Sequence, residues 1–243
     1  MRYSHESFTN FLKTVSLDRY RTEYSKIKTV EMDLPRKIQA LDSIYDIYWN
    51  KGNNYQNPPS FDDYYNEYYK RHEMDIIAFW QSTGFGNDCN CFKTGLKARI
   101  YRTWASLITQ IHAGYVAELV FGRDAVEMGT DLDHKGIDFL VTYNGKQLKI
   151  QVKKESKRPE IARMHSAIID SDGFYNIWYV VPSLHDYENP LYIVKAKEGL
   201  YRESVKSFIK YFPETGTLDR LENGFIVFTT REFEIIKNSI VQC

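Results

Sequence analysis

Apolar and polar residues alternate along residues 136–156, GIDFLVTYNGKQLKIQVKKES, which is the pattern of two half-buried strands. Asn144-Gly145 separates the two runs, and both residues tolerate the positive φ angles of a tight two-residue turn. Such a turn pairs Tyr143 with Lys146, and the register of both strands follows from that pair. One face of the hairpin is then expected to be buried by six apolar residues: Ile137, Phe139, Val141, Leu148, Ile150 and Val152.

The same register gathers polar side chains on the opposite face of the hairpin. Asp138 lies directly across from Gln151, and Lys153 is two residues further along, within diagonal reach. By strand alternation, Lys154 points to the other face, together with Val152. The pattern therefore predicts a carboxylate, an amide and an ammonium group side by side at one end of the hairpin.

A long helix is predicted from about Lys97 to Gly122, because glycine is a common helix terminator and the segment carries an apolar stripe. The stripe recurs at steps of three and four residues: Ile100, Trp104, Leu107, Ile108, Ile111, Tyr115 and Leu119. Glu118 falls on this stripe, three residues after Tyr115, and an unpaired buried carboxylate is costly. We therefore expect Glu118 to have a partner, which is either a simple Lys or Arg ion pair, a proton or a metal.

The remaining segments predict helices before this region and strands after it. Residues 1–50 carry apolar positions at helical spacing, and residues 51–75 begin with a loop that leads into a tyrosine-rich helix. Residues 84–95 read as a second loop. Residues 125–138 read as a loop that carries Asp131 and Asp133, whereas YNIWYVVP and GFIVFTT, at 175–182 and 224–230, read as buried strands.

The order of these elements predicts an α/β fold with a mixed central sheet flanked by helices and an N-terminal helical part. We place the N-terminal part, with its tyrosine-rich segment and loops, at residues 1–95. The second part, which contains the long helix, the hairpin and the later strands, is expected at residues 96–243.

Composition favours a globular protein, since 43% of the 243 residues are hydrophobic. No apolar run has the length of a membrane span, and the start, MRYSHESFTN, is too polar for a signal peptide, so we expect a cytoplasmic protein without a membrane partner. Cys89 and Cys91 form a C-x-C pair, but no second Cys or His pair follows at zinc-ligand spacing. We therefore expect ordinary thiols there.

Charge is balanced over the whole chain, with 32 basic and 32 acidic residues. Between residues 146 and 163, however, seven basic side chains stand against two acidic ones. This local excess fits either a solvated surface or a face that binds nucleic acid.

A carboxylate beside a neutral oxygen ligand and a lysine suits metal-assisted hydrolysis of a phosphodiester. Mg²⁺ prefers oxygen ligands and keeps several waters, so Asp138 would anchor the ion and the amide oxygen of Gln151 would add a neutral ligand. Lys153 would face the scissile phosphate and stabilise the negative charge that develops there. Glu118 would hold a water from outside the ligand set. The alternative is a surface ion pair between Asp138 and Lys153 beside an exposed glutamine.

The segments GID (136–138) and QVK (151–153) resemble the spaced signature of the PD-(D/E)xK nuclease superfamily. Gln151 stands where the usual acidic residue is found, as in a branch of restriction enzymes with D…QxK sites, and this departure leaves the number of bound metals open. Glu118 occupies the place of the first acidic residue of the superfamily.

Four longer segments are similar to the TaqI family of type II restriction endonucleases. They are IKTVEMDLP (27–35), YRTWASLITQIHAGYVAE (101–118), DLDHKGIDFLV (131–141) and QVKKES (151–156). The resemblance implies a restriction-endonuclease-like fold and a Mg²⁺-dependent enzyme that cuts both strands of a short palindrome, TCGA in the namesake, leaving 5′-phosphate ends.

The resemblance also implies roles for individual residues. Asp133 and Asp138 match the expected catalytic acids, and a lysine of the QVKK segment matches the catalytic lysine, for which strand alternation favours Lys153 over Lys154. The metal ligands would be drawn from Asp133, Asp138 and Glu118. His134, beside Asp133, is a candidate for tuning the site.

A palindromic target predicts a homodimer on double-stranded DNA, and a companion DNA methyltransferase would protect the host. DNA-contacting candidates follow the catalytic strand: Lys154, Ser156, Lys157, Arg158 and Arg163. Two alternatives stay open at this point, a structure-selective or repair nuclease of the same fold and a DNA-binding module that has lost catalysis.

Overall fold

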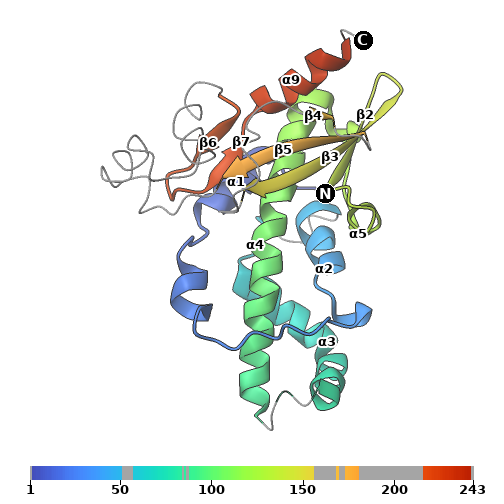
Figure 1. The fold of residues 1–243 in the computed structure, drawn as a ribbon. Coiled ribbons are helices and arrows are strands. Elements are labelled where there is room, and N and C mark those ends of the chain that lie inside the picture. The colour runs from blue at the N-terminus through green and yellow to red at the C-terminus, as the bar shows by residue number, and fades with distance from the viewer. Residues whose placement is uncertain are drawn as a thin grey trace, which may run out of the picture. The chain divides into compact units, whose positions relative to one another are not determined.

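The computed structural model describes residues 2–50, 57–83, 85, 88–155, 168–169, 173–180 and 216–241 (Figure 1). The chain forms two compact units, residues 1–111 and 112–243, and the long helix α4 (Cys89–Phe121) contributes to both. The domain boundary expected after residue 95 stays a prediction. No helix in the described ranges combines the length and the apolar character that a membrane span requires.

The N-terminal unit is helical, as predicted. Its elements are α1 (His5–Lys13), the π-helical turn η1 (Tyr20–Tyr24), the 3-10 turn η2 (Arg36–Ile38), α2 (Leu41–Tyr45), the π-helical turn η3 (Asp46–Asn50), the tyrosine-rich α3 (Phe61–Thr83) and the first part of α4. The loop predicted at residues 84–95 is wrong from residue 89 onward. Asp88 Oδ1 accepts from the backbone N–H groups of Asn90 and Cys91, at 2.8 and 3.4 Å, and so caps α4 eight residues before the predicted start.

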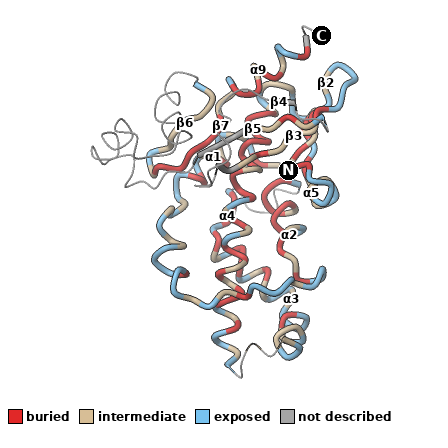
Figure 2. Tube along the Cα trace, in the orientation of Figure 1, coloured by how far each residue is buried: buried red, intermediate tan, exposed pale blue. Residues whose placement is uncertain are grey.

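Buried tyrosines form much of the core of this unit, along α2, α3 and α4 (Figure 2). The Tyr48 hydroxyl donates to the carbonyl of Pro59 at 2.8 Å, and the Tyr68 hydroxyl donates to the carbonyl of Ile38. The Tyr64 hydroxyl lies 2.9 Å from the hydroxyl of Ser43. These hydrogen bonds offset the cost of burying the phenol oxygens, which explains how so many tyrosines fit in one core.

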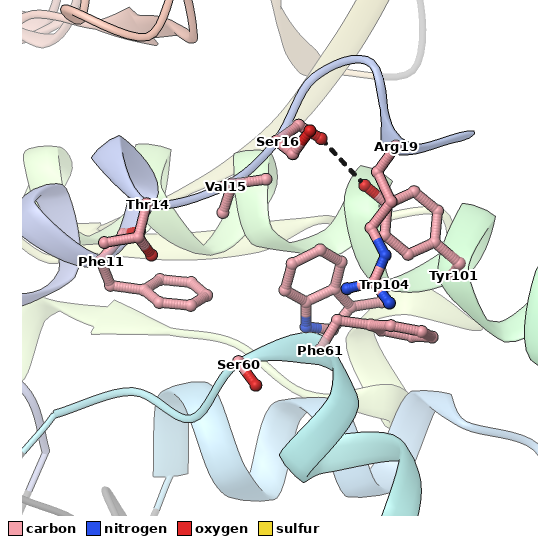
Figure 3. A pocket seen from close by; sticks show the side chains of 9 residues that line it. All are labelled: Phe11, Thr14, Val15, Ser16, Arg19, Ser60, Phe61, Tyr101 and Trp104. Carbon is pink, nitrogen blue, oxygen red and sulfur yellow. Dashed lines mark hydrogen bonds between the residues drawn. The ribbon is translucent and has the colours of Figure 1, made fainter. Parts of the chain in front are cut away.

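A small cavity of about 110 Å³ lies inside the aromatic cluster (Figure 3). The Arg19 guanidinium lies 5.3 Å from the centre of the Phe61 ring and 5.7 Å from the centre of the Tyr101 ring. The Tyr101 hydroxyl donates to the carbonyl of Ser16 at 3.3 Å, which holds the connection after α1 against α4. Aromatic packing and this hydrogen bond together tie residues 11–19 to the helix core.

Gly95 in α4 has a packing role that only the folded chain reveals. A Cβ atom at this position would lie 2.5 Å from the carbonyl oxygen of Lys28, closer than atoms can approach without movement. The backbone N–H of Val30 donates to the Gly95 carbonyl at 3.4 Å. The glycine therefore lets the segment around residue 30 lie directly on the helix.

The C-terminal unit contains a mixed five-stranded sheet of order β1-β2-β3-β5-β4 and a small sheet of β6 and β7. The strands are β1 (Val126–Glu127), β2 (Phe139–Tyr143), β3 (Lys146–Glu155), β4 (Ile168–Ile169), β5 (Phe174–Val180), β6 (Leu218–Arg220) and β7 (Ile226–Phe228). The helical elements in the described part of this unit are the end of α4, the 3-10 turn η4 (Arg123–Ala125), the short α5 (Thr130–Asp133) and α9 (Thr230–Val241). Among the described strands, β3 and β5 pair in parallel and the other pairs are antiparallel, which makes the sheet mixed. This arrangement agrees with the predicted α/β class and is consistent with a restriction-endonuclease-like fold.

The predicted hairpin register is confirmed. Tyr143 pairs with Lys146 and Phe139 with Ile150, and Asn144 has a φ of 49°. The six apolar residues assigned to one face are all buried. The strands predicted at 175–182 and 224–230 are observed as β5 and β7, the second over three residues.

The end of α4 agrees with the sequence in one respect and differs in another. Gly122 ends the helix with a φ of 102°, as predicted. Leu119, predicted to be buried, is 56% exposed because it lies in the last turn, where Glu118 and Val120 are only half-buried. Lys237 of α9 donates to the Val120 carbonyl at 2.8 Å, a favourable place for a cation at a helix C-terminus.

Glu232 in the first turn of α9 is buried, and burial raises its pKa to about 7 from an ordinary 4.5, against the opposing effect of a hydrogen bond with Thr217. The unfolded chain releases this proton near pH 4.5 and the folded chain near pH 7, so stability falls as the pH rises between these values. Glu232→Gln is expected to remove this loss, on the order of 1–3 kcal/mol at pH 8. Urea unfolding at pH 5 and pH 8 measures it.

The matched control for this prediction is Glu234→Gln on the same helix, whose side chain is 46% exposed. It should leave the difference in unfolding free energy between pH 5 and pH 8 unchanged. An equal pH dependence in wild type and Glu232→Gln would contradict the assignment.

Candidate active site

The segment before the hairpin folds differently from the predicted loop. Asp131 and Asp133 lie in the short helix α5, in which Asp133 N–H donates to the Gly129 carbonyl at 3.1 Å. The chain then turns back, with Gly136 N–H donating to the Asp133 carbonyl at 2.8 Å. A single closed helical turn, too short to show a period in the sequence, therefore positions Asp133 five residues before Asp138.

Asp138 lies directly before β2 and is held there by two contacts with β3. Its backbone N–H donates to the Ile150 carbonyl at 3.0 Å, and its Oδ2 accepts from the Val152 N–H at 2.6 Å. The second oxygen of the carboxylate is not part of this contact. The hairpin therefore fixes the direction of the side chain while leaving an oxygen for a ligand.

Burial raises the pKa of Asp138 to about 6 from an ordinary 3.8. The Val152 N–H and the positive charge of Lys153 oppose this shift, and the negative charge of Asp133 adds to it. A carboxylate that is desolvated and faces a second carboxylate is a group that a cation would stabilise.

Gln151 is oriented by a residue that the sequence reading did not single out. Its Nε2 donates to the carbonyl of Gly136, so its amide oxygen is the end left for a ligand. Gly136 has a φ of 73°, and a Cβ atom there would lie 3.3 Å from Gln151 Nε2. A glycine directly before Ile137 and Asp138, the two residues ahead of β2, was the sequence signal for such a turn.

The parallel neighbour of β3 extends this polar face of the sheet. Gln151 pairs with Asn176 and Lys153 pairs with Trp178 of β5. Asn176 is half-buried and lies between two buried residues, Tyr175 and Ile177. A polar residue in an otherwise apolar strand was the sequence signal for Asn176, which adds an amide beside Gln151.

Lys153 is half-buried on the face predicted for it, which also carries Lys149, whose Nζ lies 5.1 Å from the centre of the Phe174 ring. Lys154 follows on β3, and its backbone pairs with Tyr179. Ser156, Lys157, Arg158 and Arg163 lie outside the described residues, so their predicted contacts with DNA stay predictions, as does that of Lys154. His134 is exposed directly after α5.

Glu118 is half-buried in the last turn of α4, where its carbonyl accepts from Gly122 N–H at 2.9 Å. Among the described residues, no three His, Cys, Asp or Glu side chains come together at a spacing that would hold a metal ion. Asp133 is close enough to Asp138 for its negative charge to raise the pKa of Asp138. A role for Glu118 stays a prediction.

Similarity to known proteins extends over nearly the whole chain. The model of the TaqI restriction endonuclease family matches residues 5–240. The type II restriction enzyme TthHB8I of Thermus thermophilus is 30% identical over 247 residues, which covers 98% of this chain and 88% of that protein. The type II restriction enzyme TaqI of Thermus aquaticus is 30% identical over 229 residues, covering 92% and 82%. No solved structure matches the chain.

Proposed function

This chain belongs to the TaqI restriction endonuclease family, and from that premise we propose that it cleaves both strands of double-stranded DNA at the palindrome TCGA with the help of Mg²⁺. Membership makes it a type II restriction endonuclease, so its activity is site-specific cleavage of DNA. The resemblance noted in four segments of the sequence is thereby confirmed, since the match extends over nearly the whole chain.

The observation that carries the proposal is the hairpin. Asp138 Oδ2 accepts from Val152 N–H, and Gln151 Nε2 donates to the Gly136 carbonyl, so both side chains lie where residues 136–138 meet β3. Strand alternation supports Lys153 on the face of Gln151, and β5 pairs with β3 at both positions. A surface ion pair between Asp138 and Lys153 would not require a half-buried carboxylate of raised pKa next to a second acid.

The residues present fit a Mg²⁺ ion. Asp138 has an oxygen outside its contact with Val152, Gln151 has its amide oxygen outside its contact with Gly136, and Asp133 adds a nearby negative charge. One or two carboxylates with several waters and a substrate phosphate are a common Mg²⁺ environment. When bound, Mg²⁺ supplies polarisation of the phosphoryl oxygen and lowers the pKa of a coordinated water.

Residues of the hairpin have separate proposed roles in the reaction. Asp138 would bind the metal ion, with its carboxylate oriented by the N–H of Val152. The carbonyl of Gly136 orients the amide of Gln151. Lys153 would stabilise the negative charge that develops on the scissile phosphate. Glu118 would hold a water outside the ligand set. A water oxygen bonds to phosphorus as the bond from phosphorus to the 3′ oxygen breaks, which leaves a phosphate on the 5′ end and, after proton transfer, a hydroxyl on the 3′ end.

A palindromic site is read most simply by two copies related by a two-fold axis, so we propose a homodimer on DNA. The residues that follow β3, predicted to contact DNA, would then approach each half of the site in the same way. A DNA methyltransferase that modifies TCGA would protect the host genome without contacting this enzyme.

Incubation of the protein with unmethylated plasmid and Mg²⁺ is expected to give discrete fragments whose ends all fall at TCGA. The expectation follows from the family of the chain and from the proposed homodimer, in which each subunit would contact one half of the palindrome. Sequencing of the fragment ends measures the site and the cut position, and the same plasmid methylated at TCGA is the control.

Three outcomes would contradict the proposal. A smear of random products would indicate a nuclease without site specificity, and cutting only at junctions or damaged bases would indicate a structure-selective or repair nuclease. Binding without any cutting would indicate a DNA-binding module that has lost catalysis.

A further inference from the structure

An open groove of about 430 Å³ lies between α3 and α4 in the N-terminal unit, and the active-site proposal uses none of its residues. Its walls carry basic, aromatic and polar side chains from both helices: Tyr65, Asn66, Tyr69, Lys70, Glu73, Lys93, Thr94 and Lys97. The Tyr65 hydroxyl donates to the Lys93 carbonyl at 3.3 Å, so the two walls are joined at its base. Figure 1 shows α3 and α4 side by side in this region.

The charge of the groove is positive, although the chain as a whole is neutral. Three lysines and one glutamate line it. Among the described residues, neither Lys70 nor Lys93 has a carboxylate within 4.0 Å. Lys70 is exposed, and Lys93 is half-buried beside Tyr69, with the charge of Glu73 nearby. Two of the three ammonium groups are therefore available to an anion.

The third lysine belongs to a network whose charges balance, with Lys97 and Arg19 against Asp62 and Glu23. Lys97 Nζ lies 2.7 Å from Asp62, and the same carboxylate lies 2.8 Å from the Arg19 guanidinium. Burial would raise the pKa of Asp62, but its contacts with Lys97 and Arg19 hold it below the usual value. Lys97 is therefore already paired, and the excess positive charge of the groove comes from Lys70 and Lys93 against Glu73.

The tyrosines of α3 position these ammonium groups. Lys93 Nζ lies 5.1 Å from the centre of the Tyr69 ring, and Lys97 Nζ lies 5.5 Å from the centre of the Tyr65 ring. Contact with an aromatic face orients an ammonium group while its N–H donors stay available to oxygen acceptors. The tyrosines of α3 thus orient two ammonium groups of α4 along an open groove.

We propose that this groove binds the phosphate backbone of double-stranded DNA and is a second DNA contact of the enzyme, outside the active site. The inference rests on the proposed function, which supplies DNA as the substrate. A neutral protein that binds a polyanion needs a local positive surface. Cations from two different helices, spread along an open groove, match the repeated charges of a backbone better than a single small anion.

The test is the salt dependence of DNA binding by a Lys70→Ala/Lys93→Ala double variant, beside the wild-type protein. The probe is a duplex of about 24 bp with one TCGA site and a second duplex with that site scrambled, titrated in Ca²⁺ to prevent cutting. Each lost phosphate contact lowers the slope of log K against log salt by about 0.9, so the double variant should lose up to roughly two units of slope. Its affinity at low salt should fall by a similar factor on both duplexes, since phosphate contacts carry no sequence information.

Two variants serve as controls. Lys26→Ala removes an exposed lysine of the same unit outside the groove and should keep the wild-type slope. Lys70→Arg/Lys93→Arg keeps both charges and should also keep the slope. The melting temperature of each variant tests whether the lysine substitutions leave the fold intact.

The results separate this inference from the proposed function. If wild type cuts at TCGA and the double variant binds with an unchanged slope, the groove does not contact DNA. A loss confined to the TCGA duplex would show base reading instead of backbone binding and would overturn the proposal. Competition by inorganic phosphate at constant ionic strength, seen in wild type and absent in the double variant, would assign the groove to a small anion.

Discussion

Asp138→Asn is expected to abolish DNA cleavage and, at pH 8, to stabilise the protein in the absence of metal. The variant keeps an oxygen that can accept from Val152 N–H, so the hairpin should survive. It removes the charged ligand that the hairpin offers, and we expect the cleavage rate to fall by several orders of magnitude. The same change removes a negative charge that is desolvated and close to Asp133.

The sign of the stability effect follows from the raised pKa of Asp138. The unfolded chain ionises near the ordinary value of 3.8 and the folded chain near 6, so stability falls as the pH rises through this window and the loss is complete above it. Asparagine does not ionise, so the variant should gain on the order of 1–3 kcal/mol at pH 8 and little at pH 4. For a chain of this size, a gain of 1 kcal/mol raises the melting temperature by roughly 2–4 °C.

Melting temperatures with EDTA and with Mg²⁺ provide a readout that does not depend on activity. Mg²⁺ should raise the melting temperature of wild type at pH 8 more than that of Asp138→Asn, because a ligand that binds the folded state stabilises it. Asp131→Asn, a change of an exposed carboxylate in α5, is the control and should keep the response to Mg²⁺. Cleavage by Asp138→Asn within about tenfold of wild type, a loss of only about 1.4 kcal/mol, would place the metal site elsewhere.

Lys153→Ala is expected to leave specific DNA binding measurable while cleavage falls by several orders of magnitude. Lys153 shares the face of Asp138 and Gln151, so the lost interaction is with charge that develops in the transition state. Lys154→Ala should instead weaken binding or reduce its salt dependence, as expected for a phosphate contact, with a smaller effect on cleavage of bound DNA.

Single-turnover cleavage at saturating enzyme, beside a binding titration in Ca²⁺, separates the two lysines. Lys149→Ala, on the same strand and in contact with Phe174, is a further control and should keep the cleavage rate. If Lys154→Ala were inactive and Lys153→Ala cut well, the roles of Gln151 and Lys153 on this face would be wrong.

The hairpin could be derived from the sequence because its determinants are local. Asn144 and Gly145 set a turn by their tolerance of positive φ, and a strand period of two then assigns every later side chain to a face. The same is true of the stripe on α4 and of Gly122 at its end. These elements needed no knowledge of distant partners.

The start of α4 and the helix α5 depended on local contacts whose signals are weak beside the turn-forming residues around them, and the exposure of Leu119 depended on what packs against the end of α4. Asp88 caps α4 inside a segment rich in turn-forming residues, and α5 is a single turn stabilised by its neighbours. Leu119 has the spacing of a core residue, but the described part of the chain leaves it exposed. Intrinsic preference is a weak guide wherever one capping contact or one packing partner changes the balance.

By itself the sequence determined the register of the hairpin from Phe139–Ile150 to Tyr143–Lys146 and the family of the chain, because turn chemistry, strand period and extended similarity are properties of the chain order. Only the tertiary structure decided that β5 lies parallel to β3 and brings Asn176 beside Gln151, that Gly136 orients Gln151, and that α3 and α4 form a basic groove. It also decided the raised pKa of Asp138, since desolvation depends on everything packed around the carboxylate. Burial and nonlocal strand pairing depend on residues far apart in the sequence, so they follow from the tertiary structure and not from any local pattern.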